Sequence, residues 1–572
     1  MIYYKVSCVN AHRHFIKFEA EFPTHQQSKV LLQLPSWRPG RYELGNFAKN
    51  IRAWHVADKS GKDLMWNKVN KDLWEVNAEG LDTIILKYEY YAADLNAGST
   101  YLDNEQLYIN PVNCFFYNHH DVQSDYRIEF DLPSSFQIAC GLGKSSTHVL
   151  TAANFDELAD CPLIASASLR HLDYAVEGIT YHLWIQGDVK LDEPRLINEF
   201  VAFTKSQIRI FKDIPCKEYH FLFQFTPYFL RHGVEHRNST VIAMGPAADF
   251  QSDVLFKDLL GISCHELFHT WNIKKIRPAD MLPYDFTKEN YSKLGYVYEG
   301  VTTYYGDLLL WRVGSINDNE WLQVIEERLQ DYFDNAGRFN LSVADSSFDT
   351  WLDGYSNGIP WRKVSIYNEG FLIALIIDIM IIRATSGNKS LDDVMSLFYE
   401  RFGKKDIGYT EADYKSLLEE VSGLNFDEVF EKLINGTHDY LPYLIDGLNE
   451  AGLTMHVLPA AKWSEAYLGM SVEENGQKVT VQSVIENSTA DKAGFWNGDD
   501  IVAINGNAPY KNFHILSRMN NGDALFHVMR KGKLEEIHVS FDGNIFGKKY
   551  KLARIEQPTD RQLSIFEKWK FS

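Results

Sequence analysis

The sequence predicts a multidomain α+β protein. From Met1 to about Leu172 it consists of short segments of alternating polarity, such as HFIKFEAEF, TIILKYEYY and DYRIEFDLP, separated by turn residues. From about Tyr174 to Leu453 helical patterns dominate, and after about Met455 short strands with glycines at their turns return. Three such patterns in 572 residues favour three main domains, each with its own core.

The first region, residues 1–172, is expected to be an antiparallel β domain because its strands alternate with period two. The second, 173–454, contains two strand patterns, ITYHLWI and YHFLFQF, followed by helical patterns such as EPRLINEFVAFTKSQIRIF, NEWLQVIEERLQDYF and EADYKSLLEEV. We expect a mixed domain that becomes mostly helical. The third, 455–545, contains the strand patterns KVTVQSVI, DIVAINGN, ALFHVMR and LEEIHVSF, and 546–572 is expected to form a C-terminal extension.

Composition excludes several classes of partner. The net charge is -20 and no dense Lys/Arg block is present, which argues against nucleic acid or an anionic membrane as partner. The longest apolar run, FLIALIIDIMII, contains Asp378 and is shorter than the about 20 residues of a membrane span, so we interpret it as a buried helix. The six cysteines show no CxxC pair, and the first residues show no secretory pattern, so reduced thiols and a cytoplasmic location are expected.

The segment HELFH places His265 and His269 four residues apart with Glu266 after the first histidine. If residues 252–275 form a helix, both imidazoles lie on one face and can reach a zinc ion at about 2.0 to 2.1 Å. Glu266 then borders the metal, where a general base belongs. The alternative is a helix whose histidines are incidental.

A catalytic zinc needs a third protein ligand and an open fourth position. The run YSKLGYVYEGVTTYYGDLLLWR reads as a second helix, and Glu299 is its one glutamate. A carboxylate in so apolar a stretch is costly unless it is paired or bound to metal, so Glu299 is the predicted third ligand. The rivals are Asp280, Asp285 and Glu289, in a Pro-interrupted stretch, and Asp307, for which a capping or supporting role is expected.

These segments resemble the glycyl aminopeptidase family of zinc metallopeptidases, which are gluzincins. HELFHTWNIKKIRP and YEGVTTYYGDLLL carry the resemblance, together with LPSWRPGRYELGNFAKNI and HGVEHRNST. It covers the whole chain and implies a thermolysin-like catalytic domain, one Zn²⁺ per chain, and peptide substrates with a free N-terminus, with glycine or alanine first.

Two further roles are implied by the resemblance. Gly233 and Glu235 match loosely the family's edge-strand Gly-x-x-Glu element, whose glutamate binds the substrate's α-ammonium, a charge that a carboxylate suits. Tyr367, in SIYNEGFLIALIIDI, matches the tyrosine that donates to the oxyanion, although Glu369 stands where lysine is common. The alternatives are a solvated edge-strand acid for Glu235 and an ordinary core tyrosine for Tyr367.

The C-terminal region resembles a PDZ domain, with Leu468, Gly469 and Met470 at the carboxylate-binding loop. Such a domain adds an extended peptide to a sheet edge, but it can equally serve only to pack on the catalytic domain. The whole chain is therefore expected to be a zinc aminopeptidase in which Glu266 activates water and Tyr367 stabilises the oxyanion. The rival functions are a zinc endopeptidase, which does not need Glu235, and a PDZ-based binding protein with a vestigial metal site.

Overall fold

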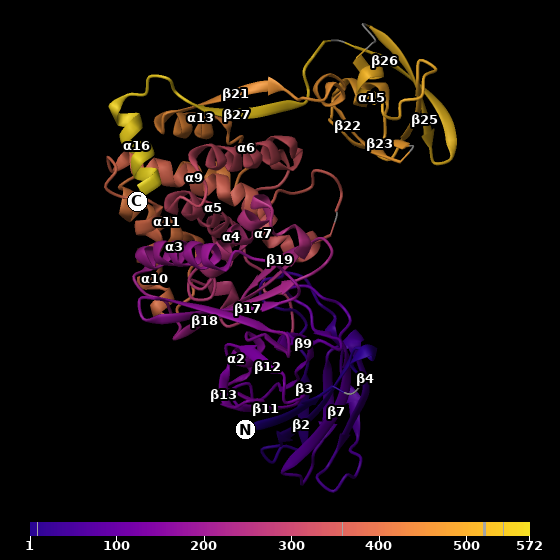
Figure 1. The fold of residues 1–572 in the computed structure, drawn as a ribbon, viewed down its shortest axis with the longest axis vertical. Helices are drawn as coiled ribbons and strands as arrows, with labels where there is room; N and C mark the ends of the chain where they lie inside the picture. Colours follow the sequence, from indigo (N-terminus) through magenta and orange to yellow (C-terminus); the bar gives the residue numbers. More distant parts are fainter. Residues whose placement is uncertain (9, 357, 477, 519–521, 542, 572) are drawn as a thin grey trace. The chain divides into compact units, whose positions relative to one another are not determined.

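The computed structural model describes residues 1–8, 10–356, 358–476, 478–518, 522–541 and 543–571. The chain forms two compact units (Figure 1). The first comprises Met1–Trp321, Gly337–Leu441 and Ser564–Ser572, and the second comprises Leu322–Ala336 and Pro442–Leu563. The multidomain α+β class predicted from the sequence is confirmed, with N-terminal sheets, a helical middle and C-terminal sheets.

A seven-stranded sheet forms most of the N-terminal region. Its strands are, in pairing order, β13 (Gly143–Ser146), β14 (Val149–Ala152), β11 (Tyr126–Asp131), β1 (Ile2–Ser7), β2 (Phe15–Pro23), β7 (Thr83–Tyr91) and β4 (Ile51–Ala57). Every pair is antiparallel except β1 with β11, which are parallel. This parallel pair is an exception within the predicted antiparallel β domain. β11 lies far from β1 in sequence, so no hairpin restricts its direction.

Two four-stranded sheets complete this region. The first comprises β10 (Tyr117–Asn118), β3 (Lys29–Gln33), β6 (Leu73–Asn77) and β5 (Trp66–Lys68); the second comprises β12 (Gln137–Cys140), β15 (Leu163–Ser166), β9 (Gln106–Ile109) and β8 (Tyr101–Leu102). One apolar core joins them to the large sheet, because the inward positions of the alternating strands are aliphatic and aromatic. Short helices α1 (Pro111–Cys114) and α2 (Phe155–Ala159) connect the strands.

The next sheet positions the candidate site. Its strands are β16 (Arg170–Val176), β17 (Ile179–Gln186), β18 (Glu218–Phe225), β20 (Ser239–Gly245) and β19 (Leu230–Glu235), in that order. β17 and β18 are parallel, and the connection between them is α3 (Glu193–Phe211), whose Phe200 ring lies 4.9 Å from that of Phe221. Within the part of the chain that the structure describes, β19 pairs with β20 alone and so forms an edge of this sheet.

Helices make up the rest of the first unit (Figure 1). They are α4 (Asp253–Phe268), α5 (Thr302–Val313), α7 (Val343–Phe348), α8 (Thr350–Asp353), α9 (Ile366–Ala384), α10 (Leu391–Arg401), α11 (Glu411–Ser422) and α12 (Asp427–Val429), with α6 (Asp318–Asp334) continuing into the second unit. The apolar run in α9 is buried from Phe371 to Ile379, as predicted. Every described helix is too short or too polar to cross a bilayer.

The second unit contains a five-stranded antiparallel sheet and a two-stranded ribbon. The sheet comprises β22 (Met470–Asn475), β23 (Lys478–Val484), β24 (Asp500–Ile504), β25 (Asp523–Arg530) and β26 (Lys533–Ser540); the ribbon comprises β21 (Leu453–Pro459) and β27 (Lys548–Arg554). Its helices are α13 (Leu441–Glu450), α14 (Thr489–Ala493) and α15 (Phe513–Arg518), and α16 (Asp560–Phe571) begins here. The predicted extension thus forms β27 and α16. All six cysteines are free.

Candidate metal centre and active site

The first two candidate ligands lie at the end of α4. Ser252 caps the helix by accepting from the Val254 amide at 3.3 Å. The helix was expected to run to residue 275, but it ends at Phe268, with His269 as its C-cap. The chain then turns, and Nδ1 of His269 lies 2.8 Å from the carbonyl oxygen of Asn272. A carbonyl only accepts, so Nδ1 carries the proton and Nε2 keeps its lone pair for a metal.

His265 and His269 face one another across this last turn. Their Nε2 atoms are 3.0 Å apart and their rings are nearly perpendicular, at 87°. Because lone pairs lie in the ring planes, two perpendicular imidazoles with close nitrogens can direct both lone pairs at one point. The i,i+4 spacing predicted from the sequence therefore produces a convergent pair in the folded chain.

Glu299 lies in a single π-helical turn, Tyr296–Val301, immediately before α5. Its Oε2 is 3.4 Å from Nε2 of His269 and 3.8 Å from Nε2 of His265. Ligands of a tetrahedral zinc at about 2.0 to 2.1 Å are about 3.4 Å from one another. The three measured separations lie around that value, so these atoms fit zinc. Single π-turns of this kind are frequent at functional sites.

Glycines allow the helices around the site to approach closely. A Cβ atom built on Gly300 would lie 2.4 Å from the Cα atom of Gly370, so α9 meets the Glu299 turn backbone to backbone. A Cβ built on Gly306 would lie 3.1 Å from Cβ of His265, and this brings α5 against α4. Three elements that are distant in sequence are thus held together at one site.

Glu266, the predicted base, is buried beside the two histidines. Its Oε2 has no hydrogen-bond partner among the described residues. Its Oε1 would lie 2.2 Å from a Cβ built on Gly233, so β19 can pass this close only because residue 233 lacks a side chain. Burial raises the pKa of Glu266, and the carboxylates of Glu235 and Glu299 raise it further. A bound cation would lower it again.

Glu235 ends β19 on the same side as Gly233. Ligand atoms of Glu235, Glu266 and His269 all lie within 4.8 Å of one another. The side chain of Glu235 is buried, and its Oε1 has no hydrogen-bond partner among the described residues. A buried carboxylate oxygen without a partner is costly and suits a cationic ligand.

Tyr367 lies in the first turn of α9, behind the cap made by Ser365. Burial raises the pKa of Tyr367, and the nearby carboxylate of Glu299 raises it further. The phenol of Tyr355 also interacts with it. Tyr367 therefore lies within electrostatic reach of Glu299, and its role as oxyanion donor stays a prediction. Glu369, which departs from the family pattern, is buried two residues away.

Two residues of the site were missed in the sequence. Tyr42 donates a hydrogen bond from its hydroxyl to Oε1 of Glu299 at 3.3 Å, which orients this carboxylate. A Cβ built on Gly40, whose φ is +78°, would lie 2.5 Å from Oε2 of Glu235. Both belong to the segment LPSWRPGRYELGNFAKNI that carried the family resemblance, but nothing in one sequence pairs these positions with residues 235 and 299.

The rival ligands lie apart from this group. Asp285 accepts from the hydroxyl and amide of Thr287, at 2.6 and 2.9 Å, which stabilises its loop. Asp280 lies in a short 3₁₀ turn and Glu289 in the following loop, while Asp307 lies within α5. None of these four contributes an atom to the three-residue group of His265, His269 and Glu299 found among the described residues.

The predicted peptide-binding loop of the second unit lies at the start of β22. Leu468 and Met470 are buried in the core of this domain, and Gly469 between them has φ of +68°, a conformation that favours glycine. β22 pairs with β23 alone in the described sheet and forms its edge.

Comparison with known proteins identifies three regions of the chain. Residues 3–167 match the Peptidase M61 N-terminal domain, 258–373 match the M61 glycyl aminopeptidase domain, and 466–541 match the PDZ domain. No curated protein matches the sequence. A crystal structure of an aminopeptidase N family protein from Idiomarina loihiensis shares 26% identity and a TM-score of 0.90, with 99% of each chain covered.

More distant similarity is found to the M1 zinc metallopeptidase of Deinococcus radiodurans. It is 12% identical, with 77% of this chain and 94% of that chain covered and a TM-score of 0.48. A variant of that enzyme bound to a Tyr-Ser-Ala substrate gives the same identity and coverage with a TM-score of 0.46. The three domain matches follow the order expected from the motifs. The chain thus contains regions similar to an M61 N-terminal domain, an M61 glycyl aminopeptidase domain and a PDZ domain, and these similarities support a metallo-aminopeptidase.

Proposed function

We propose that this enzyme uses one zinc ion per chain to remove a small first residue, glycine or alanine, from peptides with a free N-terminus. The observation that carries the proposal is the proximity of Glu235, Glu266 and His269, whose ligand atoms lie within 4.8 Å of one another. In a peptide the α-nitrogen is only about 2.5 Å from the carbonyl carbon of the same residue. A carboxylate that binds the α-ammonium must therefore lie this close to the base if the first peptide bond is cleaved.

The substrate backbone is expected to lie along β19. This strand forms a sheet edge, so its outer N–H and C=O groups are available to an extended peptide. Glu235 binds the α-ammonium through the oxygen that lacks a partner. The preference for glycine or alanine is supported by the family resemblance.

Zinc, when held by His265, His269 and Glu299, polarises the carbonyl and lowers the pKa of water. Glu266 accepts a proton from the attacking water at its carboxylate and delivers it to the leaving amine. The hydroxyl of Tyr367 donates to the oxygen on which negative charge develops, and Tyr42 keeps Glu299 oriented through its hydrogen bond. Burial of these groups excludes competing water and strengthens each electrostatic interaction.

Glu235→Ala tests this proposal. Removing one partner of a buried ion pair costs about 3 to 5 kcal/mol, so kcat/KM on a glycyl or alanyl arylamide should fall by about two to three orders of magnitude. Weak activity on an N-acetylated peptide should stay unchanged, because that substrate has no ammonium group.

A wild-type enzyme that cleaves blocked and free peptides equally fast would contradict the proposal. So would a Glu235→Ala variant that is equally impaired on both substrates. Either result would make the protein a zinc endopeptidase, in which an extended peptide passes along β19 without terminal recognition.

The PDZ domain belongs to the same proposal as a peptide-binding module. An extended C-terminal peptide would add to the free edge of β22, with its carboxylate at the loop of Leu468, Gly469 and Met470. The backbone N–H of Gly469 would have to leave the carbonyl oxygen of Ser464, to which it donates here. The cytoplasmic location stays a prediction.

A further inference from the structure

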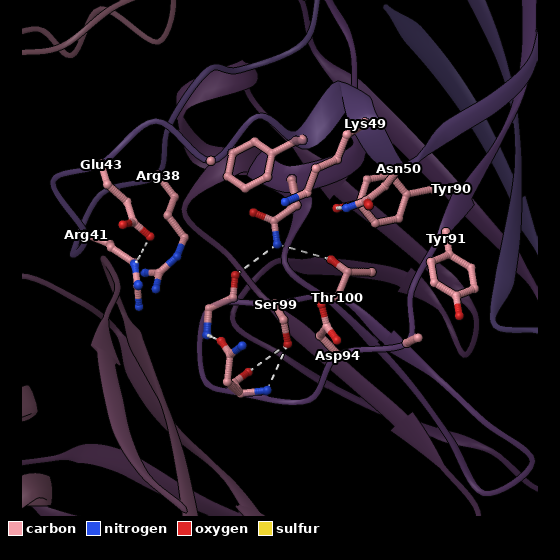
Figure 2. A pocket seen from close by; sticks show the side chains of 16 residues that line it. Arg38, Arg41, Glu43, Lys49, Asn50, Tyr90, Tyr91, Asp94, Ser99 and Thr100 are labelled. Atoms are coloured by element: carbon pink, nitrogen blue, oxygen red, sulfur yellow. Dashed lines mark hydrogen bonds and ion pairs between the residues drawn. The ribbon is translucent and has the colours of Figure 1, made fainter. Parts of the chain in front are cut away.

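The N-terminal region contains a polar hollow that the peptidase mechanism does not use. Its volume is about 300 Å³, which lies at the lower end of the range for small-molecule sites. Figure 2 shows Arg38 and Arg41 at one side, Tyr90 and Tyr91 at the other, and Lys49, Asp94 and Ser99 around it. Residues of the loop 93–100 and of the short helix Phe47–Asn50 also line it.

Arg38 is the unusual member of this hollow. It is only 5% exposed, and a Cβ built on Gly98 would lie 2.1 Å from its Cζ, so its guanidinium rests on the backbone of the 93–100 loop. Its hydrogen bond is a long one, 3.4 Å from Nη1 to the carbonyl oxygen of Pro39. No carboxylate of the described residues lies within 4.0 Å of Arg38, and Glu235 acts on it only at longer range.

The neighbouring Arg41 shows the contrast. Its Nε donates to Glu43, so its charge is paired, and it adds to the positive potential at Arg38 without neutralising it. Burial lowers the pKa of Arg38, and Arg41 lowers it further. Buried charges in proteins are almost always paired, and an unpaired guanidinium costs free energy that an anion would recover.

Next to Arg38, the side-chain oxygen of Asn113 lacks a hydrogen-bond donor among the described residues. The amide nitrogen of Asn113 donates to the carbonyl oxygen of the same Gly98 at 2.9 Å, while its Oδ1 is buried and accepts no hydrogen bond from the described residues. Two groups next to Gly98 could therefore bind a ligand. The guanidinium of Arg38 lacks an anion, and Oδ1 of Asn113 lacks a hydrogen-bond donor.

We propose that this hollow binds a small oxyanion that also carries a hydrogen-bond donor, either a hydroxycarboxylate or a hydrogenphosphate group. The anion pairs with Arg38 and its hydroxyl donates to Asn113, while Lys49 at the exposed rim adds positive potential. The lining of the hollow includes none of the three predicted metal ligands, and its nearest link to that group is the longer-range effect of Glu235 on Arg38.

Calorimetric titration of the full-length protein with lactate, and separately with inorganic phosphate, tests the proposal at constant chloride concentration. We expect saturable binding of at least one of them, tighter than that of acetate, which lacks a donor. The tighter of the two identifies the source of the oxyanion. Arg38→Gln should weaken binding by about ten- to a hundredfold, because a charged hydrogen bond is lost.

Arg38 is buried, so circular dichroism must show that this variant folds. Lys49→Glu provides a second test on an exposed position and should weaken binding severalfold. Lys62→Glu, equally exposed but outside the hollow, is the matched control and should leave it unchanged. Absence of saturable binding for both probes, acetate bound as tightly as either, or binding unaffected by both Arg38→Gln and Lys49→Glu would overturn the proposal.

Discussion

Among the described residues, the first unit contains two clusters of two histidines and one glutamate, and their geometries differ in how well they suit a metal ion. One is His265, His269 and Glu299; the other is His182, Glu218 and His220, on the adjacent parallel strands β17 and β18. In the first the imidazole rings are perpendicular, at 87°, and their nitrogens converge. In the second the rings of His182 and His220 stack at 19°, so their lone pairs run nearly parallel.

Hydrogen bonding separates the two clusters further. His269 donates to a carbonyl through Nδ1, which leaves Nε2 free for a metal. His220 instead accepts at Nδ1 from the indole N–H of Trp184 at 3.1 Å, so in its neutral form Nε2 carries the proton, 3.4 Å from Glu218. The side chain of Glu218 is 49% exposed and that of Glu299 is 4% exposed. Two clusters with the same three residue types therefore differ in their suitability for binding a metal ion.

The zinc content of the protein and its variants tests most directly which of the two clusters binds a metal ion. We expect about one zinc per chain. Both zinc and activity should be lost in His265→Ala or Glu299→Ala, because alanine cannot replace the missing metal ligand. His182→Ala is the matched control and should keep both zinc and activity. Elemental analysis after dialysis gives the answer. Two zinc ions per chain, or full occupancy in Glu299→Ala, would contradict the assignment.

The next largest effect is expected from Glu266→Gln. Amide nitrogen cannot accept the proton, so kcat/KM should fall by about three orders of magnitude or more while the zinc content is retained. Glu218→Gln makes the same chemical change in the other cluster and should not alter turnover. Substantial activity in Glu266→Gln would rule out its role as the base.

Tyr367→Phe removes one hydroxyl and little packing. A donor to a developing oxyanion is worth about 3 to 4 kcal/mol, so kcat should fall by about two to three orders of magnitude with a smaller change in KM. Tyr181→Phe, on β17, removes a buried hydroxyl that has no partner among the described residues and is the control. Unchanged kcat in Tyr367→Phe would make it a core residue. Tyr304 and Tyr305 could not take its place, because their hydroxyls donate to Asp378 and Asp392.

The smallest expected change in kcat/KM comes from a variant in β19, and it tests how this strand positions Glu266. Gly233→Ala places a methyl group against Glu266 and should lower kcat/KM by up to about a hundredfold, since a small misplacement of a catalytic group has that cost. Gly261→Ala, in α4, meets no atom within 4 Å and should leave activity intact and raise stability slightly. Equal activity in both variants would show that Glu266 tolerates displacement.

Local patterns were enough to predict the elements. The period-two segments correspond to β2, β7, β11, β17 and β18, and the helical patterns to α3, α6 and α11, within a few residues. The i,i+4 spacing of the histidines also survives, because it depends on a single turn of helix. The end of α4 at Phe268 could not be predicted, since the chain turns there to bring the carbonyl of Asn272 to His269.

The sequence by itself determined the candidate ligands His265, His269 and Glu299, the base Glu266 and the order of the domains, because each follows from spacing or from a motif. Only the tertiary structure decided that Tyr42 orients Glu299, that Gly233 and Gly40 crowd Glu266 and Glu235, and that His220 points its lone pair at Trp184. These contacts join positions up to 257 residues apart, and which distant residues meet depends on how sheets and helices pack, which no local pattern specifies.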